Sequence, residues 1–255
     1  MKDNGLLVQY FNANTPADQT LWAKAVKDAA TLKKLGATAV WFPPATKGAA
    51  GKDDRGYAPY DLYDLGEFNQ KGSVGTRYGT KKEYLEAIDA MKAQGINVYA
   101  DIAVRQKLGA DSVEKVTAAD FNAKDIPQMI GNKKIVGALS KFTFPGRKSK
   151  YSKFKWNWNH FAGIDWQQDD FKRRVCELSG MTEMEAEKKY KLSKYDYIIG
   201  SELDLYNQEV YDELMAWAKW YEDVTGVDGF RFQEAEKIPG WFIRDFAEAA
   251  SNAGE

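Results

Sequence analysis

The feature that most constrains the fold is a regular alternation between short apolar runs and longer stretches with helical spacing. Apolar runs occur at 6–11, 37–42, 96–104 and 227–232. Stretches whose apolar residues recur every three or four positions occur at 21–35, 81–94, 210–225 and 240–250. This order of strand and helix, repeated four times, predicts four βα units built around a parallel sheet.

Local signals at the helix ends agree with this periodicity. Thr20 is the predicted N-cap of the first helix, and Gly36 and Gly95 follow the predicted ends of the first and second helices. Pro239 precedes the last helix, where proline is favoured because its missing N–H would have no partner.

The segment between the third strand and the third helix, residues 105–205, is too long for an ordinary βα loop. It predicts an inserted subdomain with its own strands, whereas 1–104 and 206–255 form the βα part. An aromatic-rich stretch at 142–166, which includes Trp156, Trp158 and Trp166, is interpreted as subdomain core. Residues 171–178 have a helical pattern that predicts a buried Cys176.

Composition excludes several classes of partner. The 36 basic and 37 acidic side chains give a net charge of -1, so neither nucleic acid nor an anionic membrane is an expected partner. The one cysteine cannot form an intramolecular disulfide. The first residues lack the apolar stretch of a signal peptide, and no apolar run reaches the ~18 residues of a membrane span. A soluble, cytoplasmic protein is therefore expected.

Four stretches carry a more specific pattern. Residues 56–68 read GYAPYDLYDLGEF, and residues 71–80 read KGSVGTRYGT. The insert contains FPGR at 144–147 and YSKFKWNW at 151–158, and the last strand contains GFR at 229–231. With these motifs, the chain resembles the α-amylase family of glycoside hydrolases, in particular the bacterial liquefying and cytoplasmic type, over nearly its whole length.

The resemblance implies a fold. The family has an eight-stranded β/α barrel with a subdomain between strand 3 and helix 3. By this mapping the chain is an α/β protein, half of a (β/α)8 TIM barrel with an inserted β-rich subdomain after strand 3. Barrel enzymes carry their sites at the C-terminal ends of the strands.

The resemblance also implies that the inherited catalysis is absent. The family motif G-F-R-x-D-A-x-K-H supplies an aspartate nucleophile, and Gln233 stands in its place, although Arg231 is retained. A retaining glycosidase needs two carboxyl groups, and an amide neither attacks nor titrates. The sequence also ends at Glu255, before the point at which the family's general acid is expected. The chain is therefore predicted to be catalytically inactive.

The remaining family positions are partly substituted. The resemblance places sugar contacts at Tyr57, Gln9, Gln106, Glu236 and Lys237, of which the last three replace other family residues. It places a degenerate calcium site at Asp196, Glu202 and Asp204. Arg105 replaces the asparagine ligand, and its positive charge should repel a divalent cation. No cofactor is expected to be required, and tight calcium binding is not expected.

These substitutions gather at the ends of strands 3 and 4 and where the insert rejoins the barrel. Such clustering favours an engineered fragment over neutral drift, with natural selection for a new surface as the alternative.

A half barrel has two unpaired strand edges and a bare inner face. We expect it to form a homodimer, to bind a complementary half-barrel chain, or to stay molten. The leading functional hypothesis is an inactive structural and self-assembly module with weak α-glucan binding. The alternatives are one half of a split α-glucan hydrolase completed by a partner, a redesigned enzyme using Glu234, Glu236 and Lys237, and a dedicated glucan-binding module.

Overall fold

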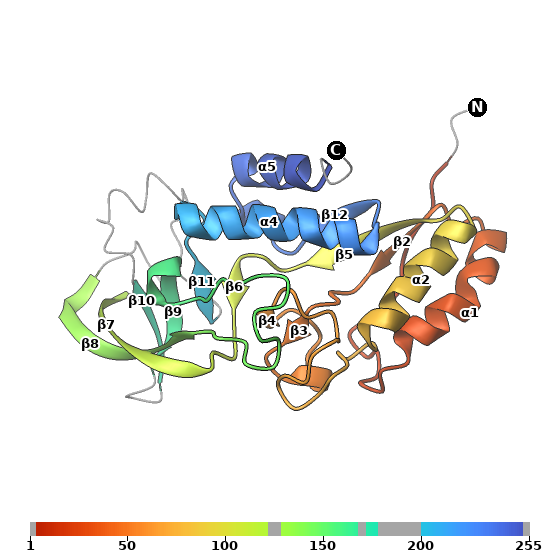
Figure 1. Ribbon diagram of the computed structural model, residues 1–255. Helices are drawn as coiled ribbons and strands as arrows, with labels where there is room; N and C mark the ends of the chain where they lie inside the picture. The colour runs from red at the N-terminus through yellow and green to blue at the C-terminus, as the bar shows by residue number, and fades with distance from the viewer. Residues whose placement is uncertain (1–3, 122–128, 168–171, 178–199, 252–255) are drawn as a thin grey trace.

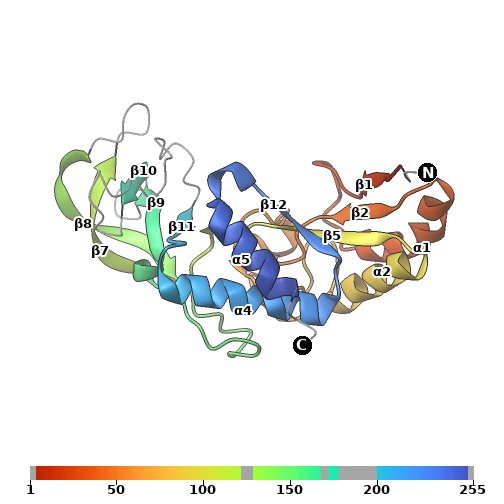
Figure 2. The ribbon, with the colours of Figure 1, turned by 90° about the horizontal axis from the view of Figure 1, so that it is seen from above.

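The computed structural model describes residues 4–121, 129–167, 172–177 and 200–251. Its central feature is a four-stranded sheet with the order β1-β2-β5-β12. The strands are β1 (Leu7–Gln9), β2 (Ala39–Phe42), β5 (Asn97–Ile102) and β12 (Gly229–Phe232). Each neighbouring pair is parallel. Figure 2 shows the four strands side by side in this order.

Each strand is followed by a helix, which confirms the predicted α/β half-barrel. The helices are α1 (Leu21–Lys34), α2 (Lys81–Ala93), α4 (Gln208–Thr225) and α5 (Gly240–Ser251). Helix α1 packs beside α2, and α4 packs beside α5 (Figure 1). Among the described residues, no helix has both the length and the apolar composition that crossing a membrane requires.

Helices α1 and α2 end before Gly36 and Gly95 as predicted, but the predicted N-cap of α1 is wrong. The Thr80 side chain accepts a hydrogen bond from the backbone of Glu83, whose side chain accepts one from the Thr80 backbone, and this pair forms a capping box. Thr20, the predicted cap of α1, makes no such bond. Its backbone has helical angles rather than the extended ones that direct a cap oxygen at the first turn, and its hydroxyl donates to Asp18 instead.

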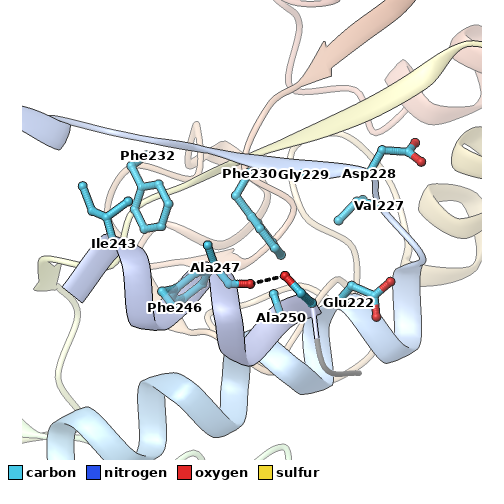
Figure 3. A pocket seen from close by; sticks show the side chains of 11 residues that line it. Glu222, Val227, Asp228, Gly229, Phe230, Phe232, Ile243, Phe246, Ala247 and Ala250 are labelled. Carbon is cyan, nitrogen blue, oxygen red and sulfur yellow. Dashed lines mark hydrogen bonds between the residues drawn. The ribbon is translucent and has the colours of Figure 1, made fainter. Parts of the chain in front are cut away.

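The apolar strand residues face the helices. Val40 and Phe42 on β2 are fully buried, and the ring of Phe42 lies 5.3 Å from that of Trp22 on α1. On β12, Phe230 lies 5.3 Å from Phe246 of α5 (Figure 3). Because side chains alternate along a strand, the other face presents the residues between them: Trp41, Tyr99, Asp101 and Arg231. The inner face of the sheet, which is expected to be uncovered, carries polar and amphipathic side chains.

The segment between β5 and α4 forms a separate six-stranded sheet with the order β6-β11-β9-β10-β7-β8. Its strands are β6 (Gln106–Lys107), β7 (Ser112–Phe121), β8 (Met129–Lys141), β9 (Phe161–Gln167), β10 (Lys172–Glu177) and β11 (Ser201–Leu203). A short hairpin, β3 (Lys47–Gly48) and β4 (Pro59–Asp61), lies in the loop after β2. Figure 1 shows the six-stranded sheet at the end of the molecule opposite α1 and α2.

Two expectations about the insert need correction. Trp156 is buried as predicted, but Trp158 and Trp166 are each 38% exposed and do not belong to the core. Cys176 lies in strand β10 rather than in a helix, and it pairs with Ile164 of β9 and Asp120 of β7. The helical interpretation failed because a short apolar segment carries too few periods to separate helix from strand, and pairing with neighbouring strands decides.

Candidate functional site

The polar residues of the candidate site meet where β5 and β12 end. Arg231 of β12 stands beside Asp101 of β5 in the sheet register. The Arg231 guanidinium lies 3.2 Å from one carboxylate oxygen of Asp101, and the Tyr57 hydroxyl donates to the other at 2.6 Å. The guanidinium also lies over the Trp41 ring, 4.9 Å from its centroid. Asp101 thereby orients an arginine and a tyrosine at the open face of the sheet.

Burial controls the electrostatics of this trio. Burial raises the pKa of the Asp101 carboxyl, and the Tyr57 hydroxyl and Arg231 only partly offset it. Burial and the hydrogen bond to Asp101 raise the pKa of Tyr57, so its hydroxyl stays protonated and remains a donor. The side chain of Arg231 is 44% exposed, which leaves it accessible to a ligand.

A second cluster joins the barrel to the insert. Arg105 follows β5 and is 4% exposed. Its guanidinium donates to Glu202 of β11 at 3.0 Å and to Glu234, beyond β12, at 2.7 Å. Lys237 donates to the second oxygen of Glu234 at 2.5 Å. One cation thus links two segments that are far apart in the sequence.

The two carboxyl groups of this cluster have opposite pKa shifts. Burial raises the pKa of Glu202, against the lowering effect of Arg105. Burial also disfavours ionisation of Glu234, but Lys237 and Arg105 together outweigh it and lower its pKa. Glu234 is therefore ionised at neutral pH and already engaged with two cations.

Gln233 directly follows β12 and extends the parallel pairing, since its backbone N–H donates to the Ile102 carbonyl at 2.9 Å. No described residue donates a hydrogen bond to its buried side-chain oxygen. Gln106 is 3% exposed, and its amide donates to the Tyr57 carbonyl at 3.2 Å. Gln106 therefore holds the Tyr57 loop in place.

The structure does not bring every predicted ligand-contacting residue into one place. Gln9 is exposed on β1, where it pairs with Trp41 of β2, so two strands separate it from Arg231. Glu236 is exposed in a short 3-10 helix, Ala235–Lys237, and Lys237 is paired with Glu234. Tyr57, Arg231 and Asp101 form the compact part of the site.

The described residues at the predicted calcium positions are engaged by other partners. Asp196 lies outside the described residues. Glu202 holds Arg105, and Asp204 accepts a hydrogen bond from the backbone of Tyr206. Within the described ranges, no group of three or more histidine, cysteine, aspartate or glutamate side chains is arranged to hold a metal ion. Calcium requires six to eight oxygen ligands, and a guanidinium between two carboxylates is incompatible with that requirement.

A buried lysine that sequence reasoning missed lies next to this cluster. Lys107 of β6 is 1% exposed, and no described residue accepts a hydrogen bond from its ammonium nitrogen. The nitrogen lies 5.0 Å from the ring centroid of Trp156 and 5.4 Å from that of Phe142. Burial lowers the pKa of Lys107 to about 7. The sequence carries no signal for this residue, because a two-residue strand does not show which of its side chains faces the core.

Comparison with curated proteins finds extensive similarity. The chain is 44% identical over 254 residues to an α-amylase of Geobacillus stearothermophilus, which covers 99% of this chain and 46% of that protein. It is 41% identical over 243 residues to an α-amylase of Bacillus licheniformis, covering 95% and 47% respectively. For the cytoplasmic α-amylase of Escherichia coli K12, the identity is 36% over 249 residues, covering 96% and 50%. The chain spans about half the length of these relatives.

Solved structures agree on the fold. An α-amylase of Geobacillus thermoleovorans complexed with acarbose matches 99% of this chain and 45% of its own, with a TM-score of 0.55 and 16% identity. An Anoxybacillus α-amylase matches 97% and 44%, with a TM-score of 0.54 and 16% identity. No protein-family model matches the chain. The chain is thus a homologue of the α-amylases that corresponds to the N-terminal portion of their sequence and to about half of their TIM barrel.

Proposed function

We propose that this chain is a catalytically inactive, α-amylase-derived half-barrel that self-assembles and binds α-glucan weakly. One observation carries the proposal: Gln233 stands where the family motif has its nucleophile. Its backbone bond to Ile102 keeps it at the C-terminal end of the sheet, the end at which barrel enzymes act. A neutral amide at this point forms no glycosyl–enzyme bond.

The neighbouring carboxyl groups support the absence of catalysis. Asp101 is engaged by Tyr57 and Arg231, and Glu202 and Glu234 are both engaged by Arg105. A retaining glycosidase needs one free carboxylate to attack and a second carboxyl group to donate a proton, about 5–5.5 Å apart. The described carboxyl groups at these strand ends act instead as partners for fixed cations.

Weak glucan binding is supported by the partly exposed surface around Tyr57. Tyr57 and Trp41 are each partly exposed, and Arg231 offers N–H donors beside them. Aromatic side chains with a few well-placed polar groups are typical of the lining of small-ligand sites. One relative, 40% identical over 252 residues, is a glucan 1,4-α-maltohexaosidase of a Bacillus species, which favours an α-1,4-glucan as the ligand class.

Calorimetric titration with maltoheptaose tests the binding. We expect a weak but saturable signal that is lost in Tyr57→Ala and kept in Gln9→Ala, because Gln9 lies on a different strand from the Asp101 trio. Equal binding by both variants, or no heat with the unmodified chain, contradicts the glucan part of the proposal. Release of reducing sugar by the pure chain contradicts the inactive part.

A second candidate function is one half of a split α-glucan hydrolase, retaining and specific for α-1,4 bonds, that a partner chain completes. It is favoured by the edge strands β1 and β12, each paired on one side only among the described residues. Gln233→Asp mixed with the remaining portion of a related α-amylase should then hydrolyse maltoheptaose. Absence of activity in that mixture eliminates this candidate.

A further inference from the structure

The loop between β8 and β9 concentrates positive charge. Residues 142–164 contain no aspartate or glutamate, although acidic and basic side chains are almost equal in number over the whole chain. Five cations lie close together within this segment: Arg147, Lys148, Lys150, Lys153 and Lys155. Figure 2 shows the segment, in green, looping out beside α4. A chain with almost no net charge therefore carries a local cationic loop.

Arg147 anchors this loop at its base. Its side chain is buried and donates to the Asp61 carboxylate of β4 at 2.8 Å. The same guanidinium donates to the backbone carbonyls of Lys150 at 2.5 Å and of Ser152 at 2.6 Å. The loop is thus closed around a buried ion pair, which fixes the course of its backbone.

The backbone of this loop is strained at several positions. Four of its non-glycine residues have a left-handed conformation: Phe144 and Lys148 at φ 52°, Ser149 at 62° and Tyr151 at 70°. Elsewhere in the described ranges, three further non-glycine residues have a positive φ. Such conformations cost free energy and gather at ligand-binding loops, where the surrounding structure holds them. The strain in this loop therefore points to a binding role.

The acidic side chain next to the loop is already engaged. Glu67 accepts hydrogen bonds from Lys81 at 3.0 Å, from the Tyr151 hydroxyl at 2.7 Å and from Lys150. Burial raises the pKa of Glu67, but these three donors outweigh burial and lower it to about 2. Glu67 is therefore neutralised by its own partners and leaves the other lysines of the loop unpaired.

The loop presents several donors without a partner in the chain. Lys148 and Lys153 are exposed, and no described residue forms an ion pair with either of them. The backbone N–H groups of Ser149 and Tyr151 likewise have no described acceptor. N–H groups that follow one another in a turn form a concave surface that binds anions. Two ammonium groups and two backbone donors are therefore available to an external anion.

We propose that residues 147–153 bind a phosphate group, either as free inorganic phosphate or as a phosphate ester of a sugar. Lys148 and Lys153 supply charge-assisted hydrogen bonds to the phosphate oxygens. The N–H groups of Ser149 and Tyr151 supply the remaining donors. A phosphate is favoured over a neutral sugar because its charge compensates both ammonium groups and its several oxygens accept from more than one donor.

The electrostatics beneath the loop favour the same ligand. Burial lowers the pKa of Lys155, and the charge of Arg147 lowers it further. Three nearby carboxyl groups act in the opposite direction without restoring the ordinary value: Asp61, Asp111 and Glu213. A region that disfavours one more positive charge attracts an anion, and the exposed lysines lie on its outer side.

A titration followed by the backbone amide signals of Ser149 and Tyr151 in two-dimensional ¹H–¹⁵N NMR tests the proposal. The ligands are inorganic phosphate, glucose 6-phosphate and, as the uncharged comparison, glucose. Sodium chloride keeps the ionic strength constant, because salt screens exposed charges. The test variant is Lys148→Gln/Lys153→Gln. The matched control is Lys27→Gln/Lys82→Gln, which loses the same charge at exposed positions of α1 and α2.

We expect saturable shifts of both amide signals with inorganic phosphate and with glucose 6-phosphate, and none with glucose. The test variant should bind both anions about tenfold more weakly, because it loses two charge-assisted hydrogen bonds. The control variant should bind like the unmodified chain. Tighter binding of glucose 6-phosphate than of inorganic phosphate would identify the sugar ester as the ligand, and equal binding would identify the phosphate group alone.

Three results would overturn the proposal. The first is the absence of saturable shifts with either anion up to about 20 mM, which is weaker than a specific site requires. The second is equal affinity in the test variant and the control, which would place the anion elsewhere. The third is an equal response to glucose, which would show that the loop does not recognise the phosphate.

Discussion

At the scale of single residues, the two buried basic side chains Arg105 and Lys107 have different surroundings. Arg105 is buried with two carboxylates, Glu202 and Glu234, within hydrogen-bonding distance. Lys107, two residues later, is buried among aromatic rings without a described hydrogen-bond acceptor. A buried charge is stable when it is paired and hydrogen-bonded, and otherwise the group releases its proton. Arg105 is therefore held by two carboxylates, whereas burial lowers the pKa of Lys107 to about 7.

Lys107 makes the stability of the fold depend on pH. Its pKa is about 7 in the folded chain, against about 10.4 for an ordinary lysine. Between these values the unfolded chain binds more protons, so this group's contribution to stability rises with pH from about 7 to about 10. The charges that act on it are Asp61, Glu213 and Asp111, which raise its pKa, and Arg147, which lowers it.

Lys107→Met should therefore be more stable than the unmodified chain at pH 7, by on the order of 1–4 kcal/mol. This difference should shrink as the pH approaches 10. Urea unfolding at several pH values measures it. Lys82→Met is the control, because the Lys82 side chain is 84% exposed on α2. Parallel pH profiles for the unmodified chain and Lys107→Met would contradict the assignment.

Removal of the Arg105 charge should have the opposite effect. Arg105→Met leaves Glu202 buried beside Glu234 without their shared cation, and breaking a buried pair in this way costs about 3–5 kcal/mol. Chemical denaturation measures the loss. Glu236→Gln is the matched control, because Glu236 is exposed in the same turn as Glu234 and should leave the midpoint unchanged. A loss below about 1 kcal/mol in Arg105→Met would show that the pair contributes little.

At the scale of elements, the β/α order was readable from the sequence because apolar spacing and a local end signal agree at α1, α2 and α5. For α2, the apolar spacing over 81–94 and the stop at Gly95 predict a helix that the structure has at Lys81–Ala93. The periodicity at 171–178 has no cap or stop to support it, and there the structure has strand β10. Short strands in an antiparallel sheet depend on their neighbours, which one segment does not contain.

The site was only partly predictable for a related reason. Gln233, Arg231 and Tyr57 were found because each belongs to a motif with fixed spacing. The bonds from Arg105 to Glu202 and to Glu234 span 97 and 129 positions in the sequence. Local patterns do not encode contacts at such separations, and Lys107 was missed because an amphipathic side chain gives no sign that its strand faces an aromatic core.

The two threonines before α1 and α2 provide a matched test of capping. Thr80→Ala removes a capping box and should destabilise the protein by about 1 kcal/mol. Thr20→Ala removes a side chain that makes no cap hydrogen bond and should cost clearly less. Thermal unfolding of both variants measures the difference. Equal losses would show that the observed cap geometry does not determine the stability of α2.

At the scale of the whole molecule, the guanidinium of Arg105 joins the half-barrel to its insert. The Arg105 contacts to Glu202 and Glu234 connect β11 with the segment after β12. We propose that this connection makes the stability of the fold independent of calcium. A cation raises stability only by binding the native state, and Arg105 already engages Glu202 and Glu234. The engineered origin inferred from the clustered substitutions stays a prediction.

Removal of divalent cations should leave the melting temperature unchanged. We expect the same midpoint, within about 1 °C, in 5 mM EDTA and in 5 mM calcium chloride, with a calcium-dependent α-amylase as the positive control. An increase of several degrees with calcium would contradict the account, since it would require a cation site with an affinity that matters.

The most direct test of the central claim is chromatography of maltoheptaose after prolonged incubation with the pure chain at micromolar concentration. The account predicts that maltoheptaose remains intact, because Gln233 supplies no nucleophile and the neighbouring carboxyl groups are held by cations. Shorter maltooligosaccharides that form in proportion to the amount of chain, and that do not co-purify with a contaminating amylase, would contradict it.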